Sequence, residues 1–547
     1  MGGILVMIRR LQFTRFAVLL AFSVAGSLRT GTLQAAKVNP NNGNFEVSYR
    51  DFFLPTAGLN IEVTRTYNSR SNYVRGYFGM GWSSEMEGYV SFDKKDVVYF
   101  EGGGGNVIRF IPAKGKTNLW TNNVFGQQSI RRLKEGYILK TPAAKDIVFD
   151  NAGRLVKITD RNKNFYELVY NKANRPELIR DNLNNQIKIG WGTAGNFPRI
   201  NLLEKGDLKA RYKYSASGDL LNASGIDAVA YDYNYDDEHN LLKVKYMDGS
   251  TREIGYNKAR DWVTSFKDRN GMLTKYDYRS DNLDPENKFG TVVSTASADK
   301  KTNASARYWY EFRRRADGSR YNYRAVSLIR GLASETIFTE CCSTPMVISQ
   351  WQAAEPKKGE SSDTWMTARS TDAKRSTFFE YYPDGLLKKK TAPDGIVTLL
   401  SYDPKTEKVA SVERAGRKLA YHYDPRGNLA WAFDSADNRR LDLTYDSLGR
   451  ITILKEARNG PKKELRTVYF RYNPQGKPIE IKEKSAAAQG SIFISYNKEG
   501  EVLGITSAGG RAIASETDMA LAQRVAITFQ NLLEIVQPAG VSLSPEG

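Results

Sequence analysis

The chain has 547 residues, enough for several domains, and its hydrophobic content of 41% is ordinary for a protein that folds in water. Its 80 Lys+Arg against 61 Asp+Glu give a formal net charge of +19, which favours attraction to polyanions such as acidic polysaccharide. The basic residues are spread along the chain without a nucleic-acid-binding motif, so nucleic acid is not the expected partner.

The first 36 residues have the pattern of an export signal. Arginines precede an apolar run at 16–28, and small residues follow up to Ala36. The run is too short to span a membrane, and no later stretch reaches that length. We therefore predict a signal peptide at 1–36 and an exported protein that is periplasmic, cell-surface or secreted. A buried first helix is the alternative.

Residues 37–142 are predicted to form a β-rich domain. A tract of four glycines at 102–105 lies between two alternating segments, 97–100 and 107–110. A phosphate-binding loop would need a helix start and a Gly-Lys-Ser/Thr sequence after the glycines, and neither follows. The tract is therefore interpreted as the tip of a hairpin.

Two blocks, 143–279 and 381–510, repeat one phrase: an aromatic residue, usually Asp or Asn, a short turn, and an alternating strand. The step is about 21 residues, within the range that indicates a repeat architecture. In the segment 440–454, Leu441, Leu443 and Tyr445 alternate with polar residues, as in a half-buried strand. Repeats of this kind predict one long antiparallel sheet of hairpins.

The turn in each phrase has its own chemistry. The Asp carboxylate can accept a backbone N–H, and the Gly can take the positive φ that ends a tight turn. We call this Tyr-Asp-x-x-Gly segment the YD turn. Its defining residues are Tyr402, Asp403, Tyr423, Asp424, Gly427, Tyr445, Asp446 and Gly449.

Between the blocks, at 280–380, the rhythm fades, and we interpret this region as an elaborated repeat with long loops where a binding face could lie. It contains the only two cysteines, Cys341 and Cys342, which are adjacent. In an exported protein they are candidates for a vicinal disulfide. A stiff turn is the simpler role, and a platform that contacts a ligand is the alternative.

The C-terminal region 511–547 contains a predicted helix at 515–537. Ser515 can cap it, and Pro538 ends it. Either this helix packs against or inside the sheet, or it docks another protein. The apolar residues proposed for docking are Met519, Leu521, Val525, Leu532 and Ile535.

Both the repeats and the preceding segment resemble a known family. The YDxxGRL pattern is similar to the YD repeat of bacterial Rhs proteins, teneurins and Tc-toxin shell subunits. The segment 43–84 resembles the region before the repeats in Rhs-like proteins, in its RTYNS and FGMGWSS phrases. The resemblance implies an all-β fold, a hairpin sheet curled into a hollow or partly open shell. Rhs toxins carry a toxin domain after the shell, and the short region after the last repeat here is expected to hold none.

Motifs for catalysis are sparse. The chain has two histidines, His239 and His422, at separate positions, and it has no GxSxG, HExxH or CxxC sequence. We expect a non-enzymatic shell or scaffold, without cofactor or metal, that binds a glycan, envelope polymer or protein. Two alternatives stay open: a carrier for separately encoded toxin, and a glycan-processing enzyme whose carboxylates meet only in space.

Overall fold

The computed structural model describes residues 36–508 except 72–74, 104, 123–127, 142–144, 195, 298–302, 316–317, 341–343, 353–374, 437, 459–463, 486–488 and 498–501. Within these ranges the regular elements are strands and two short 3-10 helices. The predicted signal peptide, the cysteine pair and the predicted helix at 515–537 lie outside the described residues.

The N-terminal elements form a small sheet of their own. Its order is β1-β2-β3-β6, and β4 and β5 make a separate hairpin. The elements are β1 (Lys37–Val38), β2 (Phe45–Leu54), β3 (Ile61–Asn68), η1 (Ser69–Ser71), β4 (Arg75–Gly76), β5 (Gly79–Met80), β6 (Trp82–Ser84) and η2 (Glu85–Glu87).

All later strands form one antiparallel sheet in chain order, from β7 to β42. We call this sheet the wall. Its first part comprises β7 (Tyr89–Asp93), β8 (Asp96–Phe100), β9 (Val107–Pro112), β10 (Leu119–Asn122), β11 (Gln128–Leu133), β12 (Gly136–Lys140) and β13 (Asp146–Phe149). The first repeat block comprises β14 (Leu155–Thr159), β15 (Phe165–Tyr170), β16 (Pro176–Asp181), β17 (Gln186–Ala194), β18 (Phe197–Lys205), β19 (Leu208–Tyr214), β20 (Leu220–Ser224), β21 (Ala230–Tyr235), β22 (Leu241–Tyr246), β23 (Thr251–Asn257), β24 (Trp262–Lys267) and β25 (Leu273–Ser280).

The middle of the wall continues the same sheet with longer strands, up to 12 residues in β27. They are β26 (Lys288–Ala296), β27 (Asn303–Arg314), β28 (Arg320–Ile329), β29 (Leu332–Phe338), β30 (Pro345–Gln352) and β31 (Ser376–Tyr381). The second repeat block comprises β32 (Leu387–Thr391), β33 (Val397–Tyr402), β34 (Val409–Arg414), β35 (Arg417–Tyr423), β36 (Leu429–Asp434), β37 (Arg439–Tyr445), β38 (Ile451–Arg458), β39 (Glu464–Tyr472), β40 (Pro478–Ser485), β41 (Gln489–Tyr496) and β42 (Val502–Ser507).

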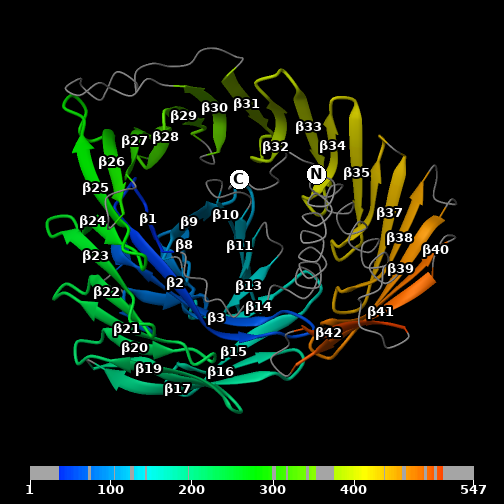
Figure 1. Ribbon diagram of the computed structural model, residues 1–547, viewed down its shortest axis with the longest axis horizontal. Helices are drawn as coiled ribbons and strands as arrows, with labels where there is room; N and C mark the ends of the chain where they lie inside the picture. The colour runs from blue at the N-terminus through cyan, green and yellow to red at the C-terminus, as the bar shows by residue number, and fades with distance from the viewer. Residues whose placement is uncertain are drawn as a thin grey trace, which may run out of the picture.

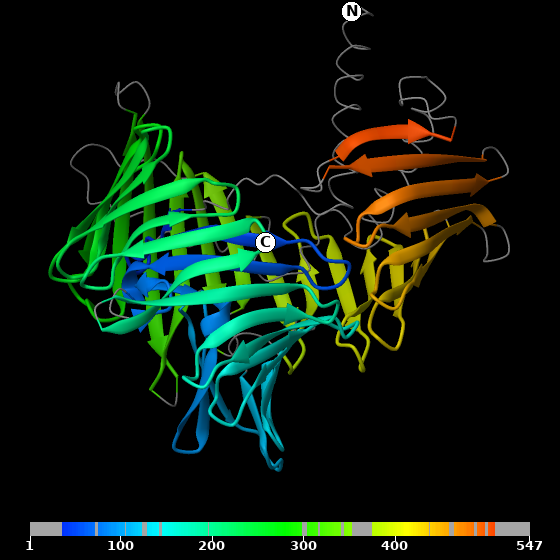
Figure 2. The same ribbon diagram turned by 90° about the horizontal axis from the view of Figure 1, so that it is seen from below.

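The wall curls into a ring that surrounds the N-terminal sheet (Figure 1). At its first end Tyr89 forms an isolated bridge with Arg154, whereas at its last end β42 pairs with β41. Seen from below, the orange strands rise away from the rest of the wall, so the sheet winds as an open spiral (Figure 2). The predicted all-β sheet of curled hairpins is confirmed.

The wall has an inner and an outer face, which the strand register defines. Residues paired across neighbouring strands share a face, and alternate residues within a strand do too. The inner face of the first block packs on the N-terminal sheet in one buried cluster that extends to Val263. The register carries this face onward through the pairs Thr291↔Tyr308, Tyr310↔Ala325, Ala325↔Thr336, Thr336↔Ile348, Ile348↔Thr377, Phe379↔Lys390, Lys390↔Thr398 and Leu400↔Val412.

Candidate functional site

In most YD turns the tyrosine joins one hairpin to the previous one by a hydrogen bond, whereas the hydroxyl of Tyr235 accepts from Trp82 Nε1 at 2.8 Å. The hydroxyl of Tyr445 donates to the carbonyl oxygen of Leu429 at 2.8 Å, and the register shifts just before this tyrosine. The same bond, at 2.6–3.2 Å, recurs across the wall. The residues that make it are Tyr170, Tyr214, Tyr256, Tyr278, Tyr402, Tyr423, Tyr445, Tyr472 and Tyr496.

Burial raises the pKa of Tyr445 to about 12, so its hydroxyl stays protonated and can donate at physiological pH. The pKa of Tyr402, of Tyr423 and of Tyr472 is also raised to about 12 by burial. The tyrosine is therefore a structural clamp within the wall.

The aspartate organises the turn itself. Asp446 Oδ1 accepts the backbone N–H of Leu448 at 3.0 Å and of Arg450 at 2.9 Å, and Gly449 has φ +84°. Asp424 accepts from Arg426 at 2.9 Å and Asn428 at 2.8 Å in the same way.

The turn after Tyr402 is one residue longer. Asp403 accepts from Lys405 at 3.0 Å and from Thr406 at 2.8 Å, and Glu407 takes the positive φ there. The backbone N–H of Thr406 lowers the pKa of Asp403, which keeps the carboxylate ionised as an acceptor.

Neighbouring turns are also joined by side chains. Arg154 Nη1 donates to Asn174 Oδ1 at 2.6 Å. His239 occupies the place of the turn glycine, with φ +64°, and its Nδ1 lies 2.7 Å from Asp219 Oδ1 in the previous turn. His239 thus has a joining role, whereas His422 stacks on Trp431 with ring centroids 5.5 Å apart on the outer face.

A buried ion pair locks the N-terminal sheet onto the first block. Arg65 Nε donates to Asp51 Oδ2 at 2.5 Å, and both side chains are at most 2% exposed. From the wall, Tyr233 accepts from Arg65 Nη2 at 2.7 Å, and Tyr212 donates to Asp51 at 3.0 Å. The Arg65 guanidinium also lies 4.5 Å from the ring centroid of Trp82.

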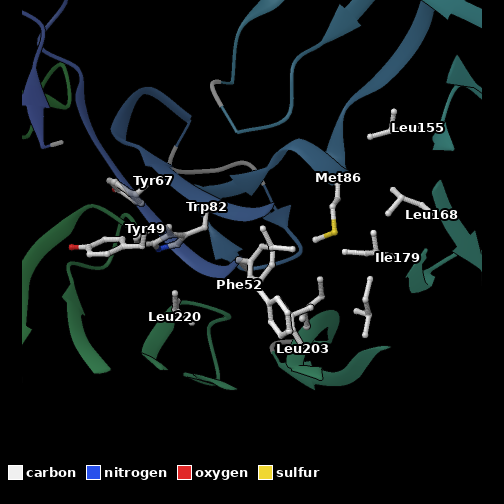
Figure 3. Close-up of a cluster of buried hydrophobic side chains, with 14 of the residues drawn as sticks. Tyr49, Phe52, Tyr67, Trp82, Met86, Leu155, Leu168, Ile179, Leu203 and Leu220 are labelled. Atoms are coloured by element: carbon white, nitrogen blue, oxygen red, sulfur yellow. The ribbon is translucent and has the colours of Figure 1, made fainter. Parts of the chain in front are cut away.

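Apolar contacts surround the Arg65–Asp51 ion pair. Tyr49, Phe52, Trp82 and Met86 reach from the N-terminal segment toward the inner side chains of the wall (Figure 3). The wall residues labelled in the same view are Leu155, Leu168, Ile179, Leu203 and Leu220. The inner face of the first block is therefore filled by the chain's own N-terminal segment.

The two coils of the spiral meet at a contact that we call the seam, formed by the turn 160–164 of the first block and the YD turns of the second. Arg161 Nη1 donates to the carbonyl of Gly427 at 2.9 Å, and Asn164 Nδ2 donates to that of Leu448 at 2.9 Å. Asn428 Nδ2 donates to Asn162 Oδ1 at 2.8 Å. The seam thus joins the two coils through their turns, and the sheet itself stays an open spiral.

Its position sets the size of the ring. Twenty-one strands, β15 to β35, lie between the two turns joined by Arg161 and Gly427. At ~4.8 Å per strand, one circuit of the wall is about 100 Å. A circuit of this length corresponds to a ring about 30 Å across, which leaves room for the N-terminal sheet at the usual sheet spacing of about 10 Å.

Lys408 adds a second cation to the seam. Its Nζ donates to the same Gly427 carbonyl that accepts from Arg161. Burial, and then the charge of Arg161, lower the pKa of Lys408 to about 8.

The central part of the inner face of the middle strands differs from both blocks, because its side chains carry no charge and many bear hydroxyl groups, whereas Arg314 and Arg320 lie on this face at the ends of β27 and β28. We call this central part the middle zone. It consists of Phe289, Thr291, Val293, Tyr308, Tyr310, Ala325, Ser327, Ser334, Thr336, Ile348, Gln350, Thr377 and Phe379. Aromatic rings beside hydroxyl and amide groups are suited to uncharged polar ligands.

The inner face of the second block is apolar. Leu441 and Leu454 are fully buried there, and Val468 is 1% exposed. An ion-paired row lies beside them: Arg417 with Asp434, and Arg466 with Glu456 at 2.8 Å.

Sequence reasoning found the YD turn residues, and the structure places them in the clamps, the turns and, for Gly427 and Gly449, at the seam. The sequence pattern did not predict a role for Arg161, Asn162 and Asn164, which lie 266 or more residues from their partners. It did not predict the Arg65–Asp51 pair either. Cys341, Cys342 and the five apolar residues proposed for docking lie outside the described residues.

Two kinds of centre are not found among the residues that the structure describes. There, no group of three or more His, Cys, Asp or Glu side chains is arranged to hold a metal ion. No helix of that part of the chain is both long enough and apolar enough to cross a membrane.

Comparisons with known proteins give a partial match. A family model described as a domain of unknown function, DUF6531, matches residues 35–110, the segment that contains the N-terminal sheet. The tRNA nuclease WapA of Bacillus subtilis (strain 168) is 24% identical over 323 residues, covering 48% of this chain and 13% of that protein. The tRNA(Glu)-specific nuclease WapA of B. subtilis subsp. natto matches equally. The chain therefore spans about an eighth of the length of these relatives.

Among solved structures, the TcdB2-TccC3 complex has a TM-score of 0.43 at 12% identity, covering 85% of this chain and 25% of that chain. The Photorhabdus luminescens Tc holotoxin pore has a TM-score of 0.42 at 12% identity, covering 86% of this chain and 26% of that chain.

Proposed function

We propose that this chain is an exported, non-enzymatic shell of the Rhs/YD-repeat type that encloses a partner at the bacterial cell envelope. The observation that carries the proposal is the seam, where the second block returns to the first and the turns of the two coils are joined. The YD clamps and turns support the assignment to this type, as does the match of residues 35–110 to DUF6531.

The partner of this shell is a glycan, an envelope polymer or a protein. The middle zone supports a polar, uncharged group as the one bound inside. The outer face carries cross-strand ion pairs such as Glu204–Lys209 at 3.4 Å and Lys243–Glu253 at 3.5 Å. With the net charge of +19, that face would attract anionic polysaccharide only non-specifically.

A second candidate is a carrier in an Rhs-type toxin system whose cargo is encoded separately. The 24% identity to WapA over 323 residues favours it. Co-expression with the product of a neighbouring toxin or immunity gene tests this candidate. A stable complex that protects the toxin from protease supports it.

If the shell encloses its partner, binding of the partner should require the seam to open. In a background with Cys341→Ser and Cys342→Ser, Asn162→Cys and Asn428→Cys can be bridged by a short bis-maleimide, because the two asparagines are in contact. Bridging before exposure to an envelope extract should block capture, whereas bridging afterwards should make captured material resist washing.

The control places the same cross-link on the outer face, with Glu204→Cys and Lys209→Cys, which form an ion pair across neighbouring strands. This cross-link should change neither capture nor release. If both cross-links leave capture unchanged, the partner binds outside and the enclosure proposal is wrong.

A further inference from the structure

The inner face of the second block is buried, although the wall there is a single sheet. Leu441 and Leu454 are 0% exposed, and Leu400, Val412, Leu419, Tyr421, Leu443, Val468, Phe470, Ile481, Ile492 and Ile494 are between 1% and 8% exposed. An antiparallel sheet buries one face only when a second layer covers it. The apolar face of the second block therefore has a covering layer.

The N-terminal segment does not supply that layer among the described residues. The buried cluster that it forms with the wall ends at Val263, and the cluster of the second block contains residues of β32–β42 only. The two cores are separate. The layer on the second block must come from another segment or from a second molecule.

The charged residues at the border of the apolar face limit which chemistry the covering layer can have. Arg417, Arg439 and Arg466 alternate with Asp434, Glu456 and Glu483 at the end of the strands away from the YD turns. Arg414 lies opposite Arg417 on the same face and adds one positive charge to the row. A surface that is apolar in the middle and bordered mostly by paired charges suits an apolar segment.

The chain contains such a segment directly beyond the last strand. β42 ends at Ser507, and the segment 515–537 carries apolar residues with helical spacing. A helix of 23 residues is about 35 Å long, which matches about seven strand spacings of the wall. The last described strand of this block thus ends eight residues before the segment, and as a helix the segment has the length to cover most of the apolar face.

We propose that residues 515–537 pack as a helix on the inner face of the second block, with Met519, Leu521, Val525, Leu532 and Ile535 toward the wall. The tail is then an internal lining, and the inner surface left for a partner is the part of the middle zone beyond Thr291 and Tyr310, which are buried. The lining does not depend on what that partner is, so it stands or falls separately from the proposed function.

Removal of the tail tests this. The chain from residue 37 is compared with one that ends at residue 510, both followed by hydrogen exchange. Without the tail, amides of β36–β41 should exchange at least tenfold faster, whereas those of β15–β23 should not change. A synthetic peptide of residues 515–537 should restore the slow exchange, and the same peptide with Leu521→Glu and Leu532→Glu should not.

Equal exchange with and without the tail, or no effect of either peptide, would overturn the proposal. If the shortened chain does not fold, photo-crosslinking of the full chain decides. Benzoylphenylalanine at position 532 should cross-link to peptides within 431–494 of the same molecule. Cross-links to a second copy, seen in a mixture of isotope-labelled and unlabelled chains, to residues 45–110, or to nothing would each refute it.

Discussion

At the scale of single residues, the tyrosines of the YD turns do two tasks that the sequence pattern alone does not separate. The ring packs on the inner face, and the hydroxyl satisfies a carbonyl at the start of the previous strand, as Tyr423 does for Val409 at 2.7 Å. Phenylalanine could do only the first. This explains why a long series of hairpins uses tyrosine where a purely apolar core would not need it.

Tyr445→Phe should therefore lower the free energy of unfolding by about 1 kcal/mol, because it removes one hydrogen bond and leaves the Leu429 carbonyl unpaired. Urea denaturation followed by circular dichroism measures the change. Tyr469→Phe is the control, since Tyr469 is 39% exposed on the outer face. Equal effects of the two substitutions would show that the clamp contributes nothing.

The ion pair under the N-terminal sheet has a larger expected effect. Arg65→Met leaves Asp51 buried without its cation and should cost about 3–5 kcal/mol. The double change Arg65→Met and Asp51→Leu should cost less than the single one, because no uncompensated charge remains. A double-mutant cycle by thermal unfolding checks this. Additive losses would mean that the two charges do not depend on each other.

At the scale of elements, the seam joins turns rather than strands, and glycines allow the close approach. At Gly449 a Cβ would lie 2.0 Å from Asn162 Nδ2, whereas at Gly395 it would meet nothing within 4 Å. The two glycines have nearly the same φ, +84° and +81°. They therefore form a matched pair for separating backbone strain from contact across the seam.

Gly395→Ala should cost about 1–2 kcal/mol for the positive φ. Gly449→Ala should cost about 1 kcal/mol more, because it displaces Asn162 from Asn428. Hydrogen exchange at 160–164 should rise only for Gly449→Ala. The extra cost should vanish when Asn162→Ala is already present, and its persistence would place the clash elsewhere.

The seam should also respond to pH through Lys408, whose pKa is lowered to about 8 by burial and by Arg161. In the unfolded chain this lysine keeps its proton up to about pH 10.4. Between about pH 8 and 10.4 the unfolded state binds more protons, so stability contributed by this site rises with pH there. Below about pH 8 the lysine is protonated in both states, so the full cost of burying its charge lowers the stability of the folded protein.

Lys408→Met should flatten the dependence of unfolding free energy on pH within this window. Lys418 is an exposed lysine on β35, and Lys418→Met should leave the slope unchanged. Denaturant titrations from pH 7 to 10 measure both. A slope that survives Lys408→Met would assign the titration to another group.

The elements show how far sequence reasoning reaches. Local chemistry, such as Asp446 in its turn and the alternation around Leu441, lies within a few residues and could be predicted. Contacts such as Arg161 with Gly427 depend on how many strands complete one circuit, which follows from accumulated twist and not from any single repeat. The same holds for the Arg65–Asp51 pair, whose partners Tyr233 and Tyr212 come from two different repeats.

At the scale of the whole molecule, the wall is continuous but its core is divided. One large buried cluster joins the N-terminal segment to the first block, and another belongs to the second block. Between them the middle strands hold only a small cluster of Val326, Leu328 and Ala333, which belongs to neither large core. Continuous backbone pairing with two separate large cores suggests that the halves can unfold one after the other.

We therefore predict two transitions in denaturant rather than one, because the cooperative unit is a packed core and not a sheet as such. Leu441→Ala should lower the stability of β36–β39 by about 2–5 kcal/mol, since this side chain is fully buried in the second cluster. Ile187→Ala, which truncates a fully buried side chain of the first cluster, should act on β15–β20 by a similar amount. Hydrogen exchange with mass spectrometry can follow each half in the same sample. If each substitution shifts both halves equally, the ring unfolds as one unit, and the seam then couples the two cores more tightly than their separate packing implies.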